Sequence, residues 1–292
     1  MNITIEGVLA EIRSRELVPV PFDYTPLTGG TVSTLVSVGY ADSKLPRFVV
    51  KMNKPAVIQA EAAFLKTYET VPLFPTLHYV DSGDRFMIYR YIPGVTDERR
   101  VKKKDWMCTL VEDVLNHYVQ VPGDSAPEPS ARLSCSISGF EWARNVIGEH
   151  LDEGDYQFVV ELSRQAVEIK MGRTVYLLHG DFGLHNFLFD EGRMTGIIDP
   201  IPAQDELIYD LVYAFCSTPD DLDLGTIQPA AAMLKDWHPA DTAGLHREML
   251  LALYRRMACC IYYHPHDLGG YLQAWSYWRG LWAALEKAER FR

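Results

Sequence analysis

The stretch LLHGDFGLHNFLFDEGRMTGIIDP, residues 177–200, constrains the fold of this 292-residue chain more than any other. Its short apolar runs and turn-forming residues predict a strand, a loop, a short strand, a turn and a returning strand. Asp181, Asn186 and Asp199 then stand at the ends of apolar strands. Two carboxylates and an amide in such positions are oxygen ligands of the kind that Mg2+ prefers. A carboxylate not neutralised by the metal is able to orient or deprotonate a hydroxyl.

The same stretch carries a family resemblance. The pattern His-x-Asp-x-x-x-x-Asn, followed by an apolar strand that ends in Asp, resembles the catalytic core of the aminoglycoside phosphotransferase and choline kinase group of small-molecule kinases. His179, Asp181, Asn186 and Asp199 fill this pattern, with Gly180 where protein kinases have Arg. The resemblance implies that Asp181 is the catalytic residue, accepting a hydrogen bond from the acceptor hydroxyl. It implies that Asn186 and Asp199 hold Mg2+.

The resemblance also implies the fold. We expect an α+β, bilobal, protein-kinase-like fold, with a small antiparallel β-sheet lobe over residues 1–92 and a larger, mainly helical lobe over residues 93–292. ATP would lie between the lobes, with GTP as a possible substitute. Apolar patterning predicts about five strands and one helix in the first region, after a helix over 2–16. In the second region it predicts helices over 104–119, 140–149, 156–170, 226–236 and 241–290.

A strand followed by a helix supplies the next expected pair. Residues 47–52 read as a strand that contains Lys51, and residues 55–68 read as a helix that begins at a proline. Glu61 falls on the more polar side of that helix. A strand lysine followed after about ten residues by a helix glutamate matches the kinase ion pair that aims the lysine at the nucleotide phosphates. The alternative is an ordinary surface ion pair.

Two further segments are expected to contact the nucleotide. The Gly29-Gly30-Thr31 turn lies between predicted strands, so it is either a plain hairpin or a loop whose backbone N–H groups cover phosphates. It lacks the full G-x-G-x-x-G pattern. The resemblance places Tyr91 and Ile92 at the hinge, where their backbone groups would bind adenine.

Charge and composition narrow the partners. Residues 1–92 hold nine basic and nine acidic residues, whereas residues 93–292 hold 19 basic and 30 acidic, so the net charge of −11 lies entirely in the second region. This balance argues against a nucleic-acid partner and would attract a cationic substrate, although acidic surfaces also simply confer solubility. We recognise no signal peptide or membrane span, and the five cysteines show no paired spacing, so we expect a cytoplasmic protein with reduced thiols.

Several further segments are expected to have a structural role rather than a direct part in the site. Asp205-Glu206 stands where the family usually has Gly-Asp, and Asp210 is expected to support the catalytic loop. The run Lys102–Lys104 reads as a solvated helix start. Residues 123–138 are rich in Pro, Ser and Asp and predict a surface loop. The aromatic residues crowded near the C-terminus read as core rather than as a ligand platform.

The sequence as a whole predicts an Mg-ATP-dependent O-phosphotransferase that acts on a small-molecule hydroxyl, most consistent with an aminoglycoside-like antibiotic and hence with antibiotic resistance. A metabolite kinase of the choline, homoserine or methylthioribose type is an alternative. So are a catalytically silent kinase-like binding protein and, in a different class, a metal-dependent phosphoesterase. The phosphoesterase leaves Lys51 and Glu61 unexplained. We expect a monomer or a weak homodimer.

Overall fold

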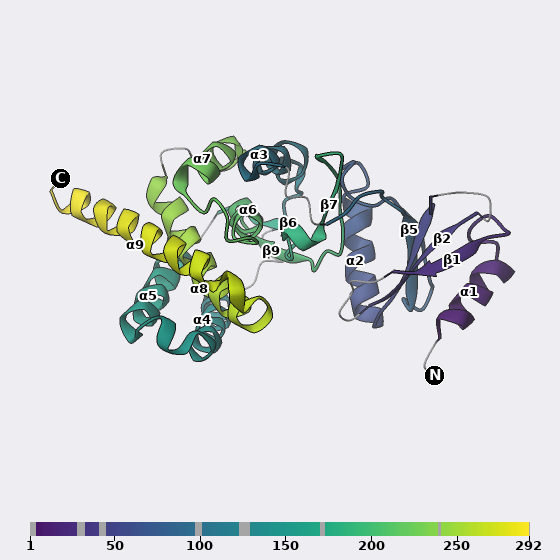
Figure 1. Ribbon diagram of the computed structural model, residues 1–292, viewed down its shortest axis with the longest axis horizontal. Coiled ribbons are helices and arrows are strands. Elements are labelled where there is room, and N and C mark those ends of the chain that lie inside the picture. The colour runs from purple at the N-terminus through teal and green to yellow at the C-terminus, as the bar shows by residue number, and fades with distance from the viewer. Residues whose placement is uncertain are drawn as a thin grey trace. The chain divides into compact units, whose positions relative to one another are not determined.

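The computed structural model describes residues 4–27, 33–40, 45–96, 101–122, 129–169, 173–238 and 241–291. Contacts divide the chain into two compact units, which are described separately (Figure 1). Unit 1 comprises Met1–Glu98, His179–Asp181 and Asn186–Pro202. Unit 2 comprises Arg99–Leu178, Phe182–His185 and Ala203–Arg292. Most of the motif-bearing stretch therefore groups with the N-terminal part of the chain.

Unit 1 is built on a five-stranded antiparallel sheet, in the order β1-β2-β3-β5-β4. Its sheet and the mainly helical remainder of the chain confirm the predicted fold class. The described residues of the unit also form two helices and a separate two-stranded hairpin. The sheet strands are β1 (Asp23–Pro26), β2 (Thr34–Gly39), β3 (Phe48–Met52), β4 (Leu77–Val80) and β5 (Phe86–Arg90).

Alternation along β3 sorts its side chains between two helices. Val50 and Met52 pack in an apolar core with Val8, Leu9 and Ile12 of α1 (Ile5–Ser14). Because successive strand residues point to opposite faces, Lys51 faces away from α1 and meets α2 (Pro55–Thr67). The two helices therefore cover opposite faces of the sheet, as Figure 1 shows. The pleat directs the one basic residue of β3 toward the helix that carries Glu61.

The second hairpin of unit 1 joins β7 (Phe187–Asp190) to β8 (Arg193–Ile197). Glu191 and Gly192 both have positive φ, 48° and 79°, at the centre of its two-residue turn. Such a turn twists in the same sense as the flanking strands and so favours a tight hairpin. The hairpin delivers the chain from Asn186, just before β7, back to Asp199, just after β8.

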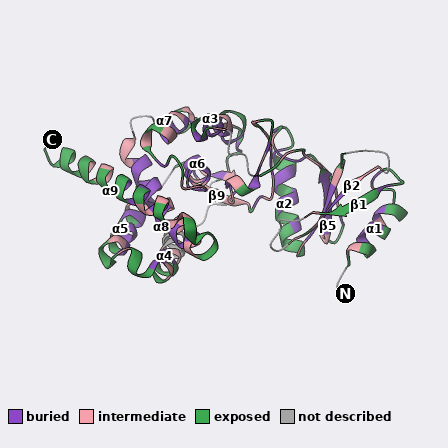
Figure 2. Ribbon diagram, in the orientation of Figure 1, coloured by how far each residue is buried: buried purple, intermediate pink, exposed green. Residues whose placement is uncertain are grey.

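Unit 2 is mainly helical, with a short ribbon of β6 (Tyr176–Leu178) and β9 (Ala203–Asp205). Helix α6 is buried on nearly every side, and Figure 2 shows it in purple and pink among the other helices of the unit. Within the described residues, no helix is long and apolar enough to cross a membrane. The helices are α3 (Lys103–Asp113), α4 (Pro129–Ile147), α5 (Glu153–Ile169), α6 (Leu207–Phe215), α7 (Leu224–Met233), α8 (Thr242–Tyr263) and α9 (Leu268–Arg290).

The loop predicted over 123–138 is wrong from residue 129 onward, because α4 begins at Pro129. A proline is well suited to the first turn of a helix, where its missing N–H and fixed φ carry no penalty. The helix predicted over 104–119 is also shorter, since α3 ends at Asp113 and a 3-10 turn, Leu115–His117, follows.

The expectation that Lys102–Lys104 is solvated is wrong for its central residue. Lys103 is 5% exposed, and its Nζ donates hydrogen bonds to the carbonyls of Phe215 and Thr218, at 3.0 and 3.1 Å, and to that of Asp220. Burial lowers the pKa of Lys103 to about 8. A cation at the C-terminal end of α6 meets the negative end of the helix dipole and satisfies carbonyls that have no helical partner.

Replacing Lys103 should therefore destabilise the protein although the residue lies outside any predicted site. Lys103→Met removes the donor shared by three buried or half-buried carbonyls, and we expect a loss of about 3 kcal/mol in the free energy of unfolding. Urea denaturation measures this loss. The neighbouring Lys104 is exposed, so Lys104→Met should change stability by no more than about 0.5 kcal/mol. Equal effects of the two substitutions would contradict the assignment.

The turn between β4 and β5 is organised by Asp81. Its carboxylate accepts hydrogen bonds from the backbone amides of Gly83 and Arg85, and from the Arg85 guanidinium at 2.5 and 2.7 Å. Arg85 also reaches Glu11 of α1 at 3.0 Å. The hydrogen bond from the Arg85 side chain, supported by the backbone amides, lowers the pKa of Asp81 to about 2.

This pKa shift predicts a dependence of stability on acid pH. A carboxylate whose pKa is depressed in the folded state stabilises it above the unfolded value, near 3.8, and loses that contribution as pH falls through about 2. Asp81→Asn should therefore lower stability at pH 6 and flatten its decline between about pH 4 and 2. Thermal unfolding monitored across this range measures both effects, and parallel curves for the two proteins would exclude the proposed linkage.

Candidate active site

Lys51 lies between two carboxylates of unit 1. Its Nζ is 2.5 Å from Glu61 Oε2 and also donates to Asp199 Oδ1. Lys51 and Glu61 are 1% and 2% exposed, whereas the Asp199 side chain is 46% exposed. The structure thus brings together three residues predicted as parts of the site from three separate segments of the chain. A surface ion pair, the alternative reading of Lys51 and Glu61, does not describe a pair that is this deeply buried.

Glu61 lies on the buried side of α2, contrary to the expectation that it falls on the polar side. Its carboxylate accepts a hydrogen bond from the Lys51 ammonium of β3. Burial raises the pKa of Glu61 to about 7 against the opposing effect of Lys51. Burial alone would lower the pKa of Lys51, but the Glu61 and Asp199 carboxylates outweigh it and raise that pKa. Two carboxylates around one cation thus explain the raised pKa of Lys51, whereas burial is the main cause of the raised pKa of Glu61.

Asp199 has an unusual backbone. Its φ is 62°, in the left-handed region that residues other than glycine seldom adopt. The preceding residue, Ile198, donates its N–H to the Asn186 carbonyl at 2.9 Å. Ile201 donates to the His179 carbonyl, also at 2.9 Å. Backbone hydrogen bonds on both sides thus hold this strained residue beside the two ends of the predicted catalytic loop.

Asn186 and Asp181 are joined directly. The Asn186 amide nitrogen donates to the Asp181 carbonyl at 2.9 Å and to its carboxylate at 3.0 Å. Because the nitrogen is used in this way, the amide oxygen is the atom that remains to bind a metal. Asn186 is 4% exposed, so its orientation is well fixed. The two residues, five positions apart in the sequence, therefore close a compact loop through these hydrogen bonds.

His179 is a structural anchor that the sequence motif contains but does not explain. Its ring stacks on Phe74 with centroids 6.2 Å apart and meets the edge of Phe64 at 5.8 Å. Its Nε2 is 3.0 Å from the Ile198 carbonyl. Phe64 stands three residues after Glu61 on α2, so one helix face carries both the ion-pair partner and the contact to the loop. That spacing was a usable signal in the sequence.

The segment proposed to bind adenine lies along the β7–β8 hairpin. Tyr91 donates its N–H to the Arg47 carbonyl at 3.0 Å, so this group continues the sheet. A Cβ on Gly196 would lie 2.7 Å from Ile92 Cδ1, which shows how closely Ile92 approaches β8. Thr195 donates its hydroxyl to the Pro93 carbonyl at 2.7 Å. Adenine binding by this segment remains a prediction. The backbone N–H of Tyr91 is not a candidate donor, because it is already bonded to the Arg47 carbonyl.

The donor set of the loop suits a hard divalent cation. Asn186 offers an amide oxygen, and Asp199 offers a carboxylate that is 46% exposed and so accessible. Carboxylate and amide oxygens are the ligands that Mg2+ takes in proteins, usually together with phosphate oxygens and water. The residues present therefore fit this ion. Gly29, Gly30 and Thr31, predicted to cover the phosphates, lie outside the described residues.

Unit 2 contains the departure from the family pattern at Asp205-Glu206. Glu206 precedes α6 but its side chain does not cap the helix; it pairs with Arg173 at 3.4 Å. Asp205 accepts a hydrogen bond from the Glu206 amide at 2.8 Å. Asp210 is fully buried and accepts a hydrogen bond from the Tyr118 hydroxyl at 2.9 Å.

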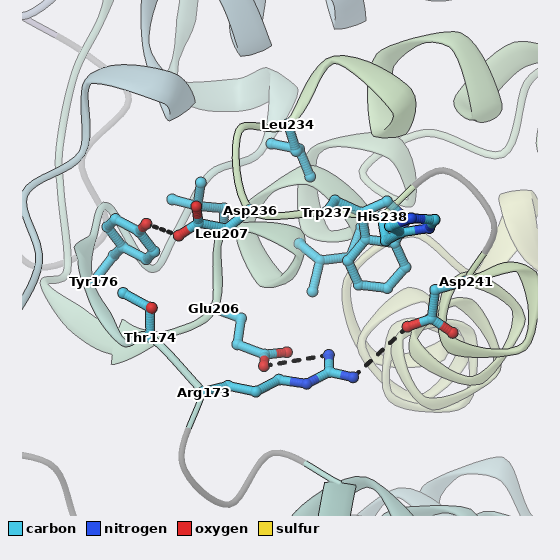
Figure 3. Close-up of a pocket in the computed structure, with 11 residues that line it drawn as sticks. Arg173, Thr174, Tyr176, Glu206, Leu207, Leu234, Asp236, Trp237, His238 and Asp241 are labelled. Carbon is cyan, nitrogen blue, oxygen red and sulfur yellow. Dashed lines mark hydrogen bonds and ion pairs between the residues drawn. The ribbon is translucent and has the colours of Figure 1, made fainter.

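Glu206 and Arg173 also line a cavity of about 380 Å3 in unit 2 (Figure 3). Arg173 lies between Glu206 and Asp241, and the Tyr176 hydroxyl donates to Asp236. Arg173 thus pairs with two carboxylates of the lining and Asp236 pairs with a hydroxyl, and we assign no chemical step to the cavity.

Comparisons with known proteins agree on one family. A model of the phosphotransferase enzyme family matches residues 23–251. No curated protein sequence matches the chain significantly. Among solved structures, a choline kinase from Cryptosporidium parvum is similar over 98% of this chain and 97% of its own, with 13% identity and a TM-score of 0.61.

Two aminoglycoside phosphotransferases are similar as well. APH(4)-Ia in complex with ADP and hygromycin B shares 16% identity, with 87% of this chain and 92% of that chain covered and a TM-score of 0.57. APH(2")-IIa in complex with streptomycin and ATP shares 16% identity, with 91% and 93% covered and a TM-score of 0.58. At these identities the likeness shows the fold.

The family model spans most of the chain, including both Lys51 and the loop from His179 to Asp199. The structural neighbours include aminoglycoside phosphotransferases and choline kinases, as the motif resemblance implied. The chain therefore belongs to the phosphotransferase enzyme family.

Proposed function

We propose that the protein transfers the γ-phosphoryl group of ATP to a hydroxyl of a small molecule. The observation that carries this proposal is the Lys51 ammonium held by Glu61 and Asp199, because it aims a fixed cation from the sheet at the loop that carries the metal ligands. GTP is the possible alternative donor. Neighbouring structures hold ADP or ATP, which supports nucleotide binding by this fold.

Each residue of the site has a part in the proposed reaction. Lys51 binds the nucleotide phosphates and is kept in place by Glu61. Asn186 and Asp199 would hold Mg2+, which would supply positive charge to the phosphoryl group in transfer. The Asp181 carboxylate accepts a hydrogen bond from the acceptor hydroxyl and aligns it for in-line attack. Little covalent work falls to the protein in such a transfer, so holding these groups in register is most of the catalysis.

For the acceptor we propose an aminoglycoside-like antibiotic. The surplus of acidic residues in the C-terminal region would attract a polycation. A metabolite kinase of the choline, homoserine or methylthioribose type is the second candidate, because a choline kinase is structurally as similar as the aminoglycoside enzymes. A catalytically silent binding protein is the third, and turnover separates it from the other two.

Asp181→Ala should abolish turnover while the nucleotide still binds. We expect a fall in kcat on the order of a thousandfold or more, because the aligned hydroxyl loses its acceptor. Mg2+-dependent ADP release would be measured against several aminoglycosides, a macrolide, choline and homoserine. Asp190→Asn, an exposed carboxylate of the same β7–β8 hairpin, is the matched control and should retain activity. Binding without turnover on any acceptor would favour the silent protein, and the absence of nucleotide binding would overturn the proposal.

Lys51 should affect both stability and nucleotide use, and the two effects can be separated. Lys51→Met leaves the Glu61 carboxylate buried without its cation, so we expect a loss of about 3–5 kcal/mol in stability. Adding Glu61→Leu should restore much of that stability, because an apolar pair replaces a broken ionic one.

The same pair of variants tests the role of Lys51 in nucleotide binding. Both the single and the double variant should bind ATP much more weakly than the original protein does. Calorimetric titration measures this affinity, and urea denaturation measures the stability of the same proteins. A double variant that is as stable as the original protein and binds ATP equally well would show that Lys51 is structural.

A further inference from the structure

The chain leaves α6 at Phe215 and runs without helix or strand from Cys216 to Leu222, and side chains from three other helices donate hydrogen bonds to most of the carbonyls of this stretch. This arrangement is needed because buried carbonyls without partners are costly. We call residues 215–222 the carbonyl loop. Lys103 donates to the carbonyls of Phe215, Thr218 and Asp220. Arg256 donates to the Ser217 carbonyl at 2.8 Å, and Tyr271 donates to the Cys216 carbonyl at 3.0 Å. Trp278 donates to the Leu222 carbonyl at 2.8 Å.

One side chain of the carbonyl loop reaches the predicted catalytic loop. The Ser217 hydroxyl accepts a hydrogen bond from the backbone N–H of Leu184 at 3.2 Å. The same hydroxyl donates its proton to the Ala214 carbonyl at 2.7 Å. Because its only proton is committed to α6, the oxygen presents a lone pair to Leu184. Ser217 is 9% exposed, so water competes little for this position.

Packing around Leu184 supports the same anchoring. A Cβ on Gly183 would lie 2.6 Å from His185 Cε1 and 3.4 Å from Tyr213 Cε1, so the His185 ring folds against the backbone beside α6. Phe182 is fully buried. Residues 182–185 thus belong to unit 2 by contact, while Asn186 follows in the same 3-10 turn, Leu184–Asn186.

We propose that Ser217 is a positioning residue for the phosphoryl transfer inferred above. Its hydroxyl fixes the backbone amide of Leu184, where the 3-10 turn Leu184–Asn186 begins. The fixed turn then directs the side-chain oxygen of Asn186 toward the proposed metal. A turn released at Leu184 is free to rotate about its backbone, which would move that oxygen without altering any ligand. This inference rests on the proposed function for its consequence in catalysis, but its structural part does not.

The test compares Ser217→Ala with Ser217→Thr, which keeps a hydroxyl, and with Ser163→Ala. Ser163 is a buried serine of α5, 3% exposed, and is the matched control. The first measurement is hydrogen–deuterium exchange of a peptide covering residues 182–187. The second is the affinity for Mn2+, a substitute for Mg2+, in the presence of a non-hydrolysable ATP analogue. Turnover is the third.

We expect Ser217→Ala to accelerate exchange in the 182–187 peptide at least about fivefold, as the loss of one hydrogen bond predicts. It should weaken Mn2+ binding about tenfold, the usual effect of removing an outer partner of a metal ligand. Ser217→Thr and Ser163→Ala should resemble the original protein in both measurements. If Ser217→Ala does not fold, Ser217→Cys, whose sulfur accepts hydrogen bonds weakly, carries the same expectations.

A merely structural role gives a different result. Faster exchange confined to the end of α6, with the 182–187 peptide and Mn2+ affinity unchanged, would overturn the proposal, since Ser217 would then only terminate the helix. Failure of the proposed function has its own signature, because the original protein would bind no nucleotide and show no turnover. The exchange measurement would still decide whether Ser217 holds the loop.

Discussion

The Lys51 ammonium, shared between Glu61 and Asp199, is the interaction on which unit 1 depends. It joins β3, helix α2 and the chain that leaves β8, which are distant in sequence. Its geometry follows from the pleat of the sheet: a slip of one residue in the pairing of β3 would turn Lys51 toward α1 and leave Glu61 buried without a cation. The register of the sheet and the chemistry of the site are therefore one constraint.

Local patterns in the sequence predicted what local structure determines. Asp181 and Asn186 were predicted at the ends of short apolar strands, and they close a loop within five residues. The match of a strand lysine and a helix glutamate, about ten residues apart, to the kinase pattern likewise predicted the Lys51–Glu61 pair. The fold class followed from the family resemblance of residues 177–200, and the predicted order of strands and helices agreed with it. The roles of these residues in catalysis remain predictions.

What the sequence did not predict depends on partners far along the chain. Lys103 looked solvated because its neighbours are lysines, yet its carbonyl partners lie more than 100 residues away. Glu61 was expected on the polar side of its helix because a charged residue usually faces solvent. The buried Lys51 ammonium is the partner that allows it to face inward. Tyr271 and Trp278, expected to be core, are buried, but they also donate hydrogen bonds to the carbonyl loop. No pattern of apolar residues announces such a bond.

The left-handed backbone conformation of Asp199 can be adopted by a neutral residue as well as by a charged one. Asparagine tolerates this conformation nearly as well as aspartate, since both short side chains bond locally. An amide there would remove one of two carboxylates around Lys51 and leave the ammonium matched by Glu61 alone. The backbone therefore tolerates one substitution that would remove the charge proposed to bind Mg2+. For the proposed kinase, the step to a catalytically silent relative with the same backbone would therefore be a single substitution at Asp199.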